Sequence, residues 1–220
     1  MIKKRAFTLA ELLITLLVIG IVAVLTLPSL ITNVANKTMA TQIKSIVGSI
    51  QQLASDQMLI HKTKNLALTD FGSPGELLTP NNFAMTKSCT GSKSTENACW
   101  GSSYQNLNSG SVILTHLDNS ILLKNGASLS YSTVNYRFSE ISDMAIGYFV
   151  VDVNGPDDPN IVGRDVFGFY VTENGHVEAK YPTEIEYDEV DDGIRNLSCE
   201  AGSEVRCLRK LIENNWTMNY

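Results

Sequence analysis

The sequence predicts an α+β protein in which one long N-terminal helix, with a membrane-spanning first half and a kink at Pro28, packs on an antiparallel β-sheet. Three observations predict this fold class. About twenty mostly apolar residues run from Leu12 to Ile31 without a charge, roughly the length that crosses a bilayer as a helix. Apolar residues then recur at helical spacing up to Ile60. The remainder carries short β-rich stretches between turn residues, without βαβ alternation.

The N-terminal segment MIKKRAFTLAELL does not fit an ordinary secretory signal. Three basic residues precede the apolar run and would stay in the cytoplasm. The run is longer than a signal h-region, and no small-x-small cleavage site ends it. The one acidic residue, Glu11, lies at its start. A carboxylate well inside a bilayer costs about 2.5–3.5 kcal/mol, less near the interface, and usually has a functional partner.

A cut between Ala6 and Phe7 would create such a partner. The new α-amino group of Phe7 would be a cation at the same membrane level as Glu11. Between neighbouring helices with an axial offset, Glu11 of one chain could neutralise Phe7 of the next. The carboxylate would then act as an assembly signal. A generic uncleaved signal anchor, with Glu11 at the interface, is the alternative.

KKRAFTLAELL, followed by Gly20 and Pro28, resembles the N-terminus of prepilins and pseudopilins, the type IV pilin-like family. The resemblance implies that a prepilin peptidase and N-methyltransferase removes the leader after Ala6 and methylates Phe7. It also gives Glu11 the acidic position of the motif, and it makes Gly20 and Pro28 positions that soften or kink the helix. The family usually has Gly before the cut, and Ala6 departs from that pattern by one methyl group.

The resemblance also implies a division of the chain and a destination. We expect a single pass through the bacterial inner membrane, a periplasmic C-terminal domain, and later assembly with other pilin or pseudopilin subunits. The fibre would be a periplasmic pseudopilus or a cell-surface pilus. The expected segments are a basic leader at 1–6, a transmembrane and assembly helix at 7–31, an amphipathic second half of the helix at 32–62, and a globular domain at 63–220.

Beyond Pro28 the helical pattern predicts one buried face. Proline lacks an N–H and crowds the preceding turn, so we expect a kink rather than an end. The helix is predicted from about Phe7 to about Ile60. The residues of its apolar stripe recur at steps of three and four: Ile43, Ile46, Val47, Ile50, Leu53 and Ala54.

The globular part reads as a loop followed by strands and a final helix. From Phe71 to Gly110 the chain is rich in Gly, Ser, Asn, Thr and Pro, and we interpret it as loop. Two Asn-Gly pairs indicate hairpin turns. The strands are predicted at Ser111–His116, Ser120–Leu123 and Ala127–Ser132, around Phe149 and Phe169, and at His176–Ala179, with the turns at Asn125–Gly126 and Asn174–Gly175. A short amphipathic helix follows, with Val205, Leu208, Leu211 and Ile212 on its apolar face and Trp216 as a C-terminal anchor.

The four cysteines predict two disulfides in an oxidising compartment. They fall into two local pairs, Cys89 with Cys99 and Cys199 with Cys207. Three pairings are possible from sequence, and the local one is favoured. A zinc site would prefer CxxC-like spacing, which is absent.

The segment DVNGPDDPNIVGRD is an oxygen-rich loop that could hold calcium. No cofactor is certain from the sequence, and the same residues favour a plain turn between strands. The twelfth position, Gly163, rules out an EF-hand. Some pseudopilins bind calcium in such a loop, so the resemblance supports the site. The candidate oxygen ligands are Asp152, Asn154, Asp157, Asp158 and Asp165, with Asn160 between them.

Charge and motifs disfavour nucleic-acid binding and catalysis. Net charge is −6, and without Lys3, Lys4 and Arg5 it would be 14 basic against 23 acidic side chains, or −9. No general nucleic-acid binding is expected, because that binding requires neutralisation of phosphates. The three histidines are isolated, with neither HExxH nor GxSxG spacing, so no enzymatic role is expected.

We therefore interpret the chain as a structural subunit of a type IV pilus or a type II secretion pseudopilus. Its 220 residues exceed what a compact major pseudopilin needs, which favours a minor subunit. Two alternatives remain: a pilus-tip adhesin or binding subunit, and an uncleaved membrane-tethered binding domain.

Overall fold

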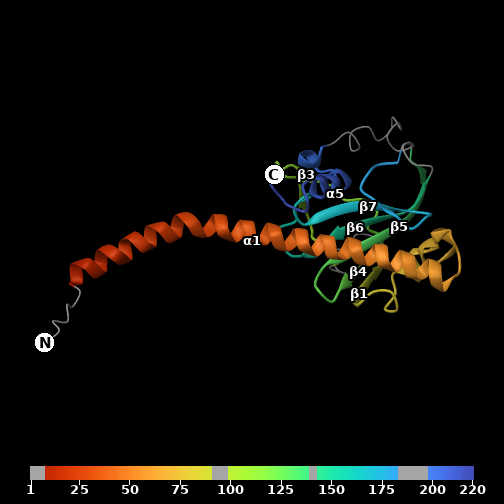
Figure 1. Ribbon diagram of the computed structural model, residues 1–220, viewed down its shortest axis with the longest axis horizontal. Helices are drawn as coiled ribbons and strands as arrows, with labels where there is room; N and C mark the ends of the chain where they lie inside the picture. Colours follow the sequence, from red (N-terminus) through yellow and green to blue (C-terminus); the bar gives the residue numbers. More distant parts are fainter. Residues whose placement is uncertain (1–7, 91–98, 139–142, 183–197) are drawn as a thin grey trace. The chain divides into compact units, whose positions relative to one another are not determined.

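The computed structural model describes residues 8–90, 99–138, 143–182 and 198–220. The chain divides into two compact units, Met1–Thr38 and Met39–Tyr220. Helix α1 (Leu9–Ile60) contributes residues to both (Figure 1). This confirms the predicted long helix, although Phe7, its predicted first residue, lies outside the described residues.

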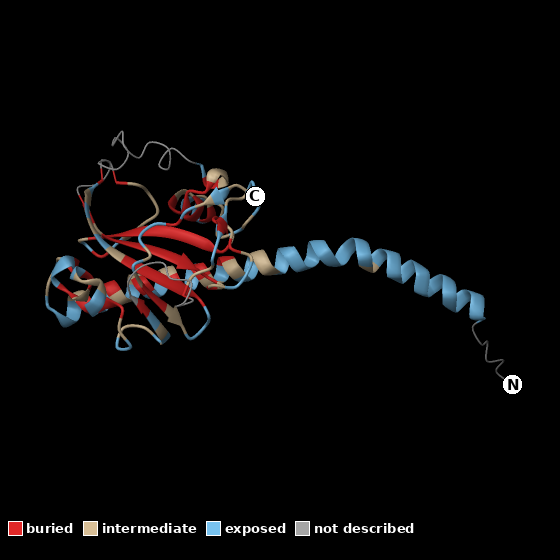
Figure 2. Ribbon diagram, turned by 180° about the vertical axis from the view of Figure 1, so that it is seen from behind, coloured by how far each residue is buried: buried red, intermediate tan, exposed pale blue. Residues whose placement is uncertain are grey.

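In the first unit, α1 is an apolar helix in which several threonine hydroxyls bond to the helix's own backbone. The hydroxyls of Thr26, Thr32 and Thr38 donate to carbonyl oxygens four residues earlier, at 2.9, 3.0 and 2.9 Å. Large apolar side chains are exposed along this part of the helix (Figure 2). By length and composition, α1 is able to cross a membrane.

The helix passes through both positions at which the sequence predicts softening. Gly20 and Pro28 lie inside α1, and the helical assignment is continuous across them. Proline removes one backbone hydrogen bond from a helix interior. The kink itself stays a prediction.

In the second unit, one face of α1 is buried in the core. Four residues of the predicted apolar stripe are buried, while Val47 and Leu53 at its margins are half-buried. Gln51 ties this face to the sheet: its amide nitrogen donates to the Gly175 carbonyl, and its oxygen accepts from the Val177 amide at 3.1 Å. The buried residues of the helix are Ala40, Ile43, Ile46, Ile50, Ala54 and Gln57.

The predicted antiparallel sheet has six strands in the order β1-β4-β5-β6-β7-β8. Every neighbouring pair is antiparallel. A separate hairpin pairs β2 (Tyr104–Gln105) with β3 (Ser111–Val112). The strands of the large sheet are β1 (Met85–Thr90), β4 (Asn119–Leu123), β5 (Ser128–Arg137), β6 (Met144–Asp152), β7 (Val166–Thr172) and β8 (Val177–Glu178).

Aromatic side chains fill the core at the centre of the sheet. Phe149 of β6 stacks on Phe169 of β7, with ring centroids 5.3 Å apart. Phe71, in the short helix η2 (Asp70–Gly72), meets Phe149 and Tyr131 edge-on at 6.3 and 6.0 Å. The Tyr131 hydroxyl donates to the Phe71 carbonyl at 2.6 Å. The two strands predicted around Phe149 and Phe169 are thereby confirmed as the centre of the fold.

Both predicted Asn-Gly turns are present. Gly126 has a φ of 90° between β4 and β5, and Gly175 has a φ of 80° between β7 and β8. Residues with a side chain rarely adopt this left-handed conformation, whereas glycine does so at little cost. The two glycines therefore fix the register of their hairpins.

The segment 71–110, predicted as loop, contains regular structure. It holds α2 (Pro74–Leu77), the edge strand β1 and the strand β2. In β1, exposed Thr86 and Ser88 alternate with half-buried or buried neighbours. An edge strand with one solvated face needs few apolar residues, so its sequence resembles a loop. In the other direction, the predicted strand Ser111–His116 shortens to β3, and His116 adopts a left-handed φ of 62°.

Helix α5 (Glu204–Glu213) packs on β7 near the end of the chain. Ser203 caps it, since its hydroxyl oxygen accepts from the Arg206 amide at 3.3 Å. Val205, Leu208 and Leu211 are fully buried, as predicted, but Ile212 is 40% exposed. The apolar stripe of this helix is narrower than its sequence indicates.

Glu204, the first residue of α5, is an acidic side chain buried against the sheet. It is 9% exposed, and its carboxylate accepts from the Tyr148 hydroxyl of β6 at 2.7 Å. Burial raises the pKa of Glu204, although its own backbone amide, the Tyr148 bond and nearby His116 act in the opposite sense. Folding therefore favours the protonated form of Glu204 more than the unfolded chain does.

This burial predicts a pH-dependent stability that Glu204→Gln removes. A raised pKa in the folded state gives stability that is full below the usual glutamate pKa of about 4.3 and is lost as pH rises through the raised value. Thermal melts from pH 4 to 8 should show the melting temperature of Glu204→Gln gaining on wild type as pH rises. Glu213→Gln, exposed on the same helix, is the control. Parallel pH profiles for wild type and Glu204→Gln would contradict the prediction.

Candidate assembly motif and cation site

The start of α1 is closed by a reciprocal pair of side chains. The Glu11 carboxylate accepts from the Thr8 amide at 2.8 Å and from its hydroxyl at 2.9 Å. In return, the Thr8 hydroxyl oxygen accepts from the Glu11 amide at 3.2 Å. This arrangement is a capping box, which satisfies amides that a helix N-terminus leaves free.

The capping box places the Glu11 carboxylate beside the backbone amide of Thr8. Ala6 and Phe7, the predicted cleavage and methylation positions, lie outside the described residues. Sequence reasoning named Glu11 for its charge and missed its local role. The signal was present as Thr-x-x-Glu before an apolar run. Glu11 therefore has one role inside its own chain, whatever it contacts in another.

The oxygen-rich loop between β6 and β7 is folded around Asn154. Its amide nitrogen donates to the carbonyls of Asp157 and Pro159, the second at 3.3 Å. The loop then turns at Ile161, whose carbonyl accepts from the amides of Arg164 and Asp165 at 3.0 and 3.1 Å. The two ends of the loop are joined at the carboxyl end of β6, where the Val153 amide donates to the Asp165 carbonyl at 2.9 Å.

Two buried carboxylates lie at these ends. Asp152 accepts from the Tyr104 hydroxyl at 3.0 Å, and Asp165 accepts from the Ile161 amide at 2.7 Å. Both residues are 0% exposed. Burial, followed by the charge of Asp165, raises the pKa of Asp152 to about 8. Burial likewise raises the pKa of Asp165 to about 7. A cation between them would offset the cost of keeping both ionised.

Several buried polar atoms of this loop have no hydrogen-bond partner among the described residues. They include Oδ1 of Asn154, Oδ1 of Asn160 and Oδ2 of Asp165, together with Nε of Arg164. These are four of the six such side-chain atoms in the described ranges. Buried polar groups are nearly always paired, so such atoms call for an explanation. Carboxylate and amide oxygens are the ligands that calcium prefers.

The predicted ligand set does not gather as a whole. Asp157 and Asp158 are exposed. Within residues 8–90, 99–138, 143–182 and 198–220, no group of three or more His, Cys, Asp or Glu side chains is placed to hold a metal ion. The buried candidate oxygens of the loop are thus those of two carboxylates, Asp152 and Asp165, and of two amides, Asn154 and Asn160. Sequence reasoning could not tell which of these residues the loop would bury.

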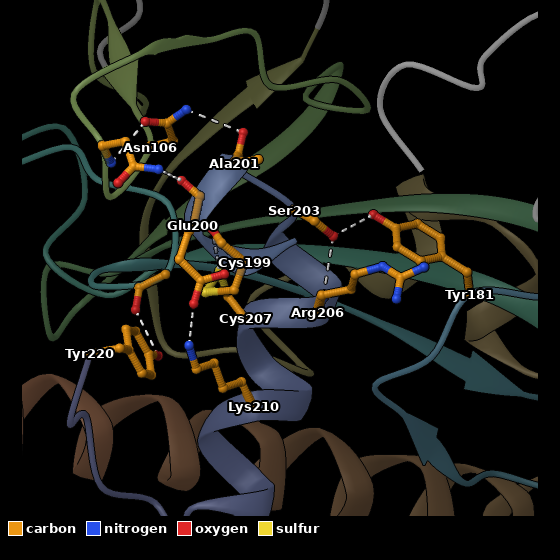
Figure 3. Close-up of a disulfide and its surroundings, with 12 residues drawn as sticks. Asn106, Tyr181, Cys199, Glu200, Ala201, Ser203, Arg206, Cys207, Lys210 and Tyr220 are labelled. Carbon is orange, nitrogen blue, oxygen red and sulfur yellow. Dashed lines mark hydrogen bonds and ion pairs between the residues drawn. A yellow bond between two sulfur atoms is a disulfide. The ribbon is translucent and has the colours of Figure 1, made fainter. Parts of the chain in front are cut away.

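The four cysteines form two disulfides, and each joins cysteines that are close in the sequence. One joins Cys89 of β1 to Cys99, next to Trp100, whose indole donates to the Ser120 hydroxyl at 2.8 Å. The other joins Cys199 of η5 (Cys199–Ala201) to Cys207 of α5 (Figure 3). Both cysteines of the second pair are buried.

The histidines form no catalytic constellation in the described part of the chain. His61 lies 3.5 Å from Asp70 at the end of α1. His116 packs edge-on against Tyr148, with ring centroids 5.4 Å apart. His176 lies in the β7–β8 turn region, where its amide donates to the Thr172 hydroxyl at 3.2 Å. Each has a local structural contact.

Comparison with known proteins identifies the N-terminal segment. Residues 1–27 match the prokaryotic N-terminal methylation motif, the signal motif of type IV pilins and pseudopilins. Neither the curated proteins nor the solved structures contain a match to the chain. The motif implies processing by a prepilin peptidase and assembly with other pilins, and it points to a structural subunit rather than an enzyme.

Proposed function

We propose that this chain, which carries the type IV pilin and pseudopilin signal motif at residues 1–27, is a minor structural subunit of a type IV pilus or a type II secretion pseudopilus. The motif match is the observation that carries the proposal. The long apolar helix and the six-stranded antiparallel sheet support it, because they form a pilin-like α+β architecture.

The surface of α1 supports an assembly role. Apolar side chains such as Leu13, Leu17 and Val24 are 60%, 64% and 73% exposed. An apolar surface of this extent is stable only in lipid or against other proteins. In the precursor, lipid covers it. In the fibre, the helices of neighbouring subunits take the place of lipid.

The charge distribution supports a defined orientation. Lys3, Lys4 and Arg5 precede the apolar segment, and the positive-inside rule keeps them in the cytoplasm. The domain after α1 then faces the periplasm, where disulfides form. Both observed disulfides agree with that compartment.

Processing is the first step of the proposed function. The peptidase removes residues 1–6 by cutting after Ala6, and a methyl group is added to the new amine of Phe7. Alanine is the smallest residue after glycine, so its single methyl group should hinder the peptidase little.

The N-terminal mass of the protein from its native host tests this step. The expected mature chain begins with N-methyl-Phe7. Ala6→Gly serves as the control for the cut site and should give the same mature mass, at an equal or higher rate. A wild-type chain that retains Met1 while Ala6→Gly is cut would show that Ala6 blocks the peptidase. If neither is cut, the membrane-tethered alternative replaces the fibre subunit.

Glu11 is the second element of the proposal. Its carboxylate neutralises the Phe7 amine of an adjacent subunit and so fixes the axial register. Among apolar helices the effective dielectric is low, which strengthens this attraction. The capping box holds the carboxylate at the right end of the helix, beside Thr8.

Glu11→Gln separates the charge from the cap. Glutamine retains an oxygen that can accept from Thr8, but it carries no charge. We expect normal membrane insertion and at least about a tenfold loss of incorporation into fibres, equivalent to about 1.4 kcal/mol. Thr8→Val removes the capping hydroxyl but keeps the charge of Glu11, so it should assemble far better than Glu11→Gln. Immunoblots of sheared fibres against membranes measure both. If Glu11→Gln enters fibres as well as wild type does, the proposed charge pairing is wrong.

A calcium ion in the β6–β7 loop is a second proposal, supported by the unpartnered buried oxygens. Asp152 and Asp165 would supply carboxylates, and Asn154 and Asn160 would supply amide oxygens. The ion would supply positive charge that allows both carboxylates to stay ionised. Within the chain, the Tyr104 hydroxyl donates to Asp152 and the Ile161 amide donates to Asp165, and these bonds position the two carboxylates.

Calcium addition to the chelator-treated protein tests this site. At about ten times the dissociation constant, binding stabilises the native state by roughly 1.4 kcal/mol, or about 3–6 °C in melting temperature for a chain of this size. Asp165→Asn should lose most of this shift. Asp157→Asn, exposed in the same loop, should retain it. An unchanged wild-type melting temperature in millimolar calcium would refute the site.

A further inference from the structure

Gly163, in the loop of the proposed cation site, lies directly against the Cys199–Cys207 disulfide. A Cβ atom added to Gly163 would fall 2.7 Å from the Cys207 sulfur and 3.0 Å from the Cys199 sulfur. The residue also has a φ of 94°. Only glycine combines this backbone conformation with so close an approach. The loop backbone and the disulfide therefore occupy fixed places relative to each other.

The same glycine belongs to the turn that positions Asp165. Its amide donates to the Val166 carbonyl at 3.0 Å, across the residues that lead into β7. Within this turn, the Asp165 amide donates to the Ile161 carbonyl at 3.1 Å, and the Ile161 amide donates back to the Asp165 carboxylate at 2.7 Å. A displacement of Gly163 would therefore displace the Asp165 carboxylate.

The C-terminal tail makes a third contact with Gly163, in addition to the disulfide and the Asp165 turn. The Tyr220 hydroxyl donates to the Gly163 carbonyl at 2.9 Å. Lys210 of α5 lies 4.6 Å from the centre of the Tyr220 ring and pairs with Glu200, the residue after Cys199 (Figure 3). The disulfide, α5 and the tail thus meet at one loop residue.

We propose that the Cys199–Cys207 disulfide positions the cation loop, so that cation binding and the oxidised state of this disulfide reinforce each other. The proposal rests on the calcium site proposed above. Reduction breaks one S–S bond and leaves two thiols, which cannot lie as close together as bonded sulfurs. The two sulfurs therefore separate, which changes their close contact with Gly163 and, through Gly163, the Asp165 turn.

The coupling is reciprocal by thermodynamic necessity. If the disulfide raises the affinity of the loop for calcium, calcium raises the resistance of the disulfide to reduction by the same factor at equilibrium. The wild-type protein can therefore be tested without any cysteine substitution.

The experiment measures reduction of both disulfides in the full-length mature protein. Dithiothreitol supplies two electrons to each disulfide, each sulfur takes up a proton, and the reagent becomes a cyclic disulfide. Samples are brought to equilibrium at defined ratios of reduced to oxidised dithiothreitol and alkylated, and peptide masses report each pair separately. In millimolar calcium, against chelator, the ratio that half-reduces Cys199–Cys207 should rise at least about fivefold more than the ratio that half-reduces Cys89–Cys99. Asp165→Asn should abolish this difference.

The outcomes separate this inference from the cation site itself. If calcium does not raise the wild-type melting temperature, the site is refuted and the inference falls with it. If calcium raises the melting temperature but protects both disulfides equally, the site stands and the inference is overturned, because protection then follows from global stability alone.

Tyr220→Phe gives a second test that leaves both disulfides in place. The variant keeps the ring beside Lys210 and removes the hydroxyl that bonds Gly163. Calcium affinity, measured by titration calorimetry, should fall at least about threefold, the size expected for one hydrogen bond. Tyr136→Phe, which changes a half-buried tyrosine of β5, is the matched control and should bind as wild type. Equal affinities in Tyr220→Phe and wild type would overturn the positioning role of this contact.

Discussion

The protein depends on one constraint: the apolar surface of the first part of α1 must be kept from water. Leu12 to Ile31 carries no charge, and its large side chains are exposed in the isolated chain. Burial of apolar surface is the dominant favourable term in association. A helix of this kind therefore needs lipid or other helices at every stage. The proposed cut site, the proposed leader and Glu11 all lie at the end of this segment that faces the cytoplasm in the proposed orientation.

The second unit is stabilised by its own buried core. Its core is built from the central strands β6 and β7 and from aromatic contacts such as Phe149 on Phe169. Two polar devices complete it: Gln51 bonds the β7–β8 hairpin through both ends of its amide, and Tyr148 bonds buried Glu204. Each satisfies a polar group that burial would otherwise leave unpaired. Binding or assembly chemistry can therefore vary in the surface loops while this core stays fixed.

The sequence predicts local features well and distant contacts poorly. The long helix, both Asn-Gly turns and the central strands follow from periodicity and turn chemistry, which act over a few residues. The edge strand β1 was missed because its half-solvated pattern lacks apolar residues. The contact of Gly163 with Cys207 joins residues 44 positions apart, and no short pattern records it. Which of the six oxygen-bearing loop residues are buried likewise depends on packing by Tyr104 and Ile161.

The threonine hydroxyls of α1 carry a consequence for how freely the helix can change surroundings. Thr26, Thr32 and Thr38 each bond a carbonyl of their own helix, so none needs a partner from lipid or from a neighbour. Lipid tails are about as apolar as leucine. In the proposed assembly, moving this helix between a bilayer and a protein bundle therefore exchanges one set of van der Waals neighbours for another without breaking these three threonine bonds. Such an exchange is close to balanced in free energy, and a small input of work is enough to drive it in either direction.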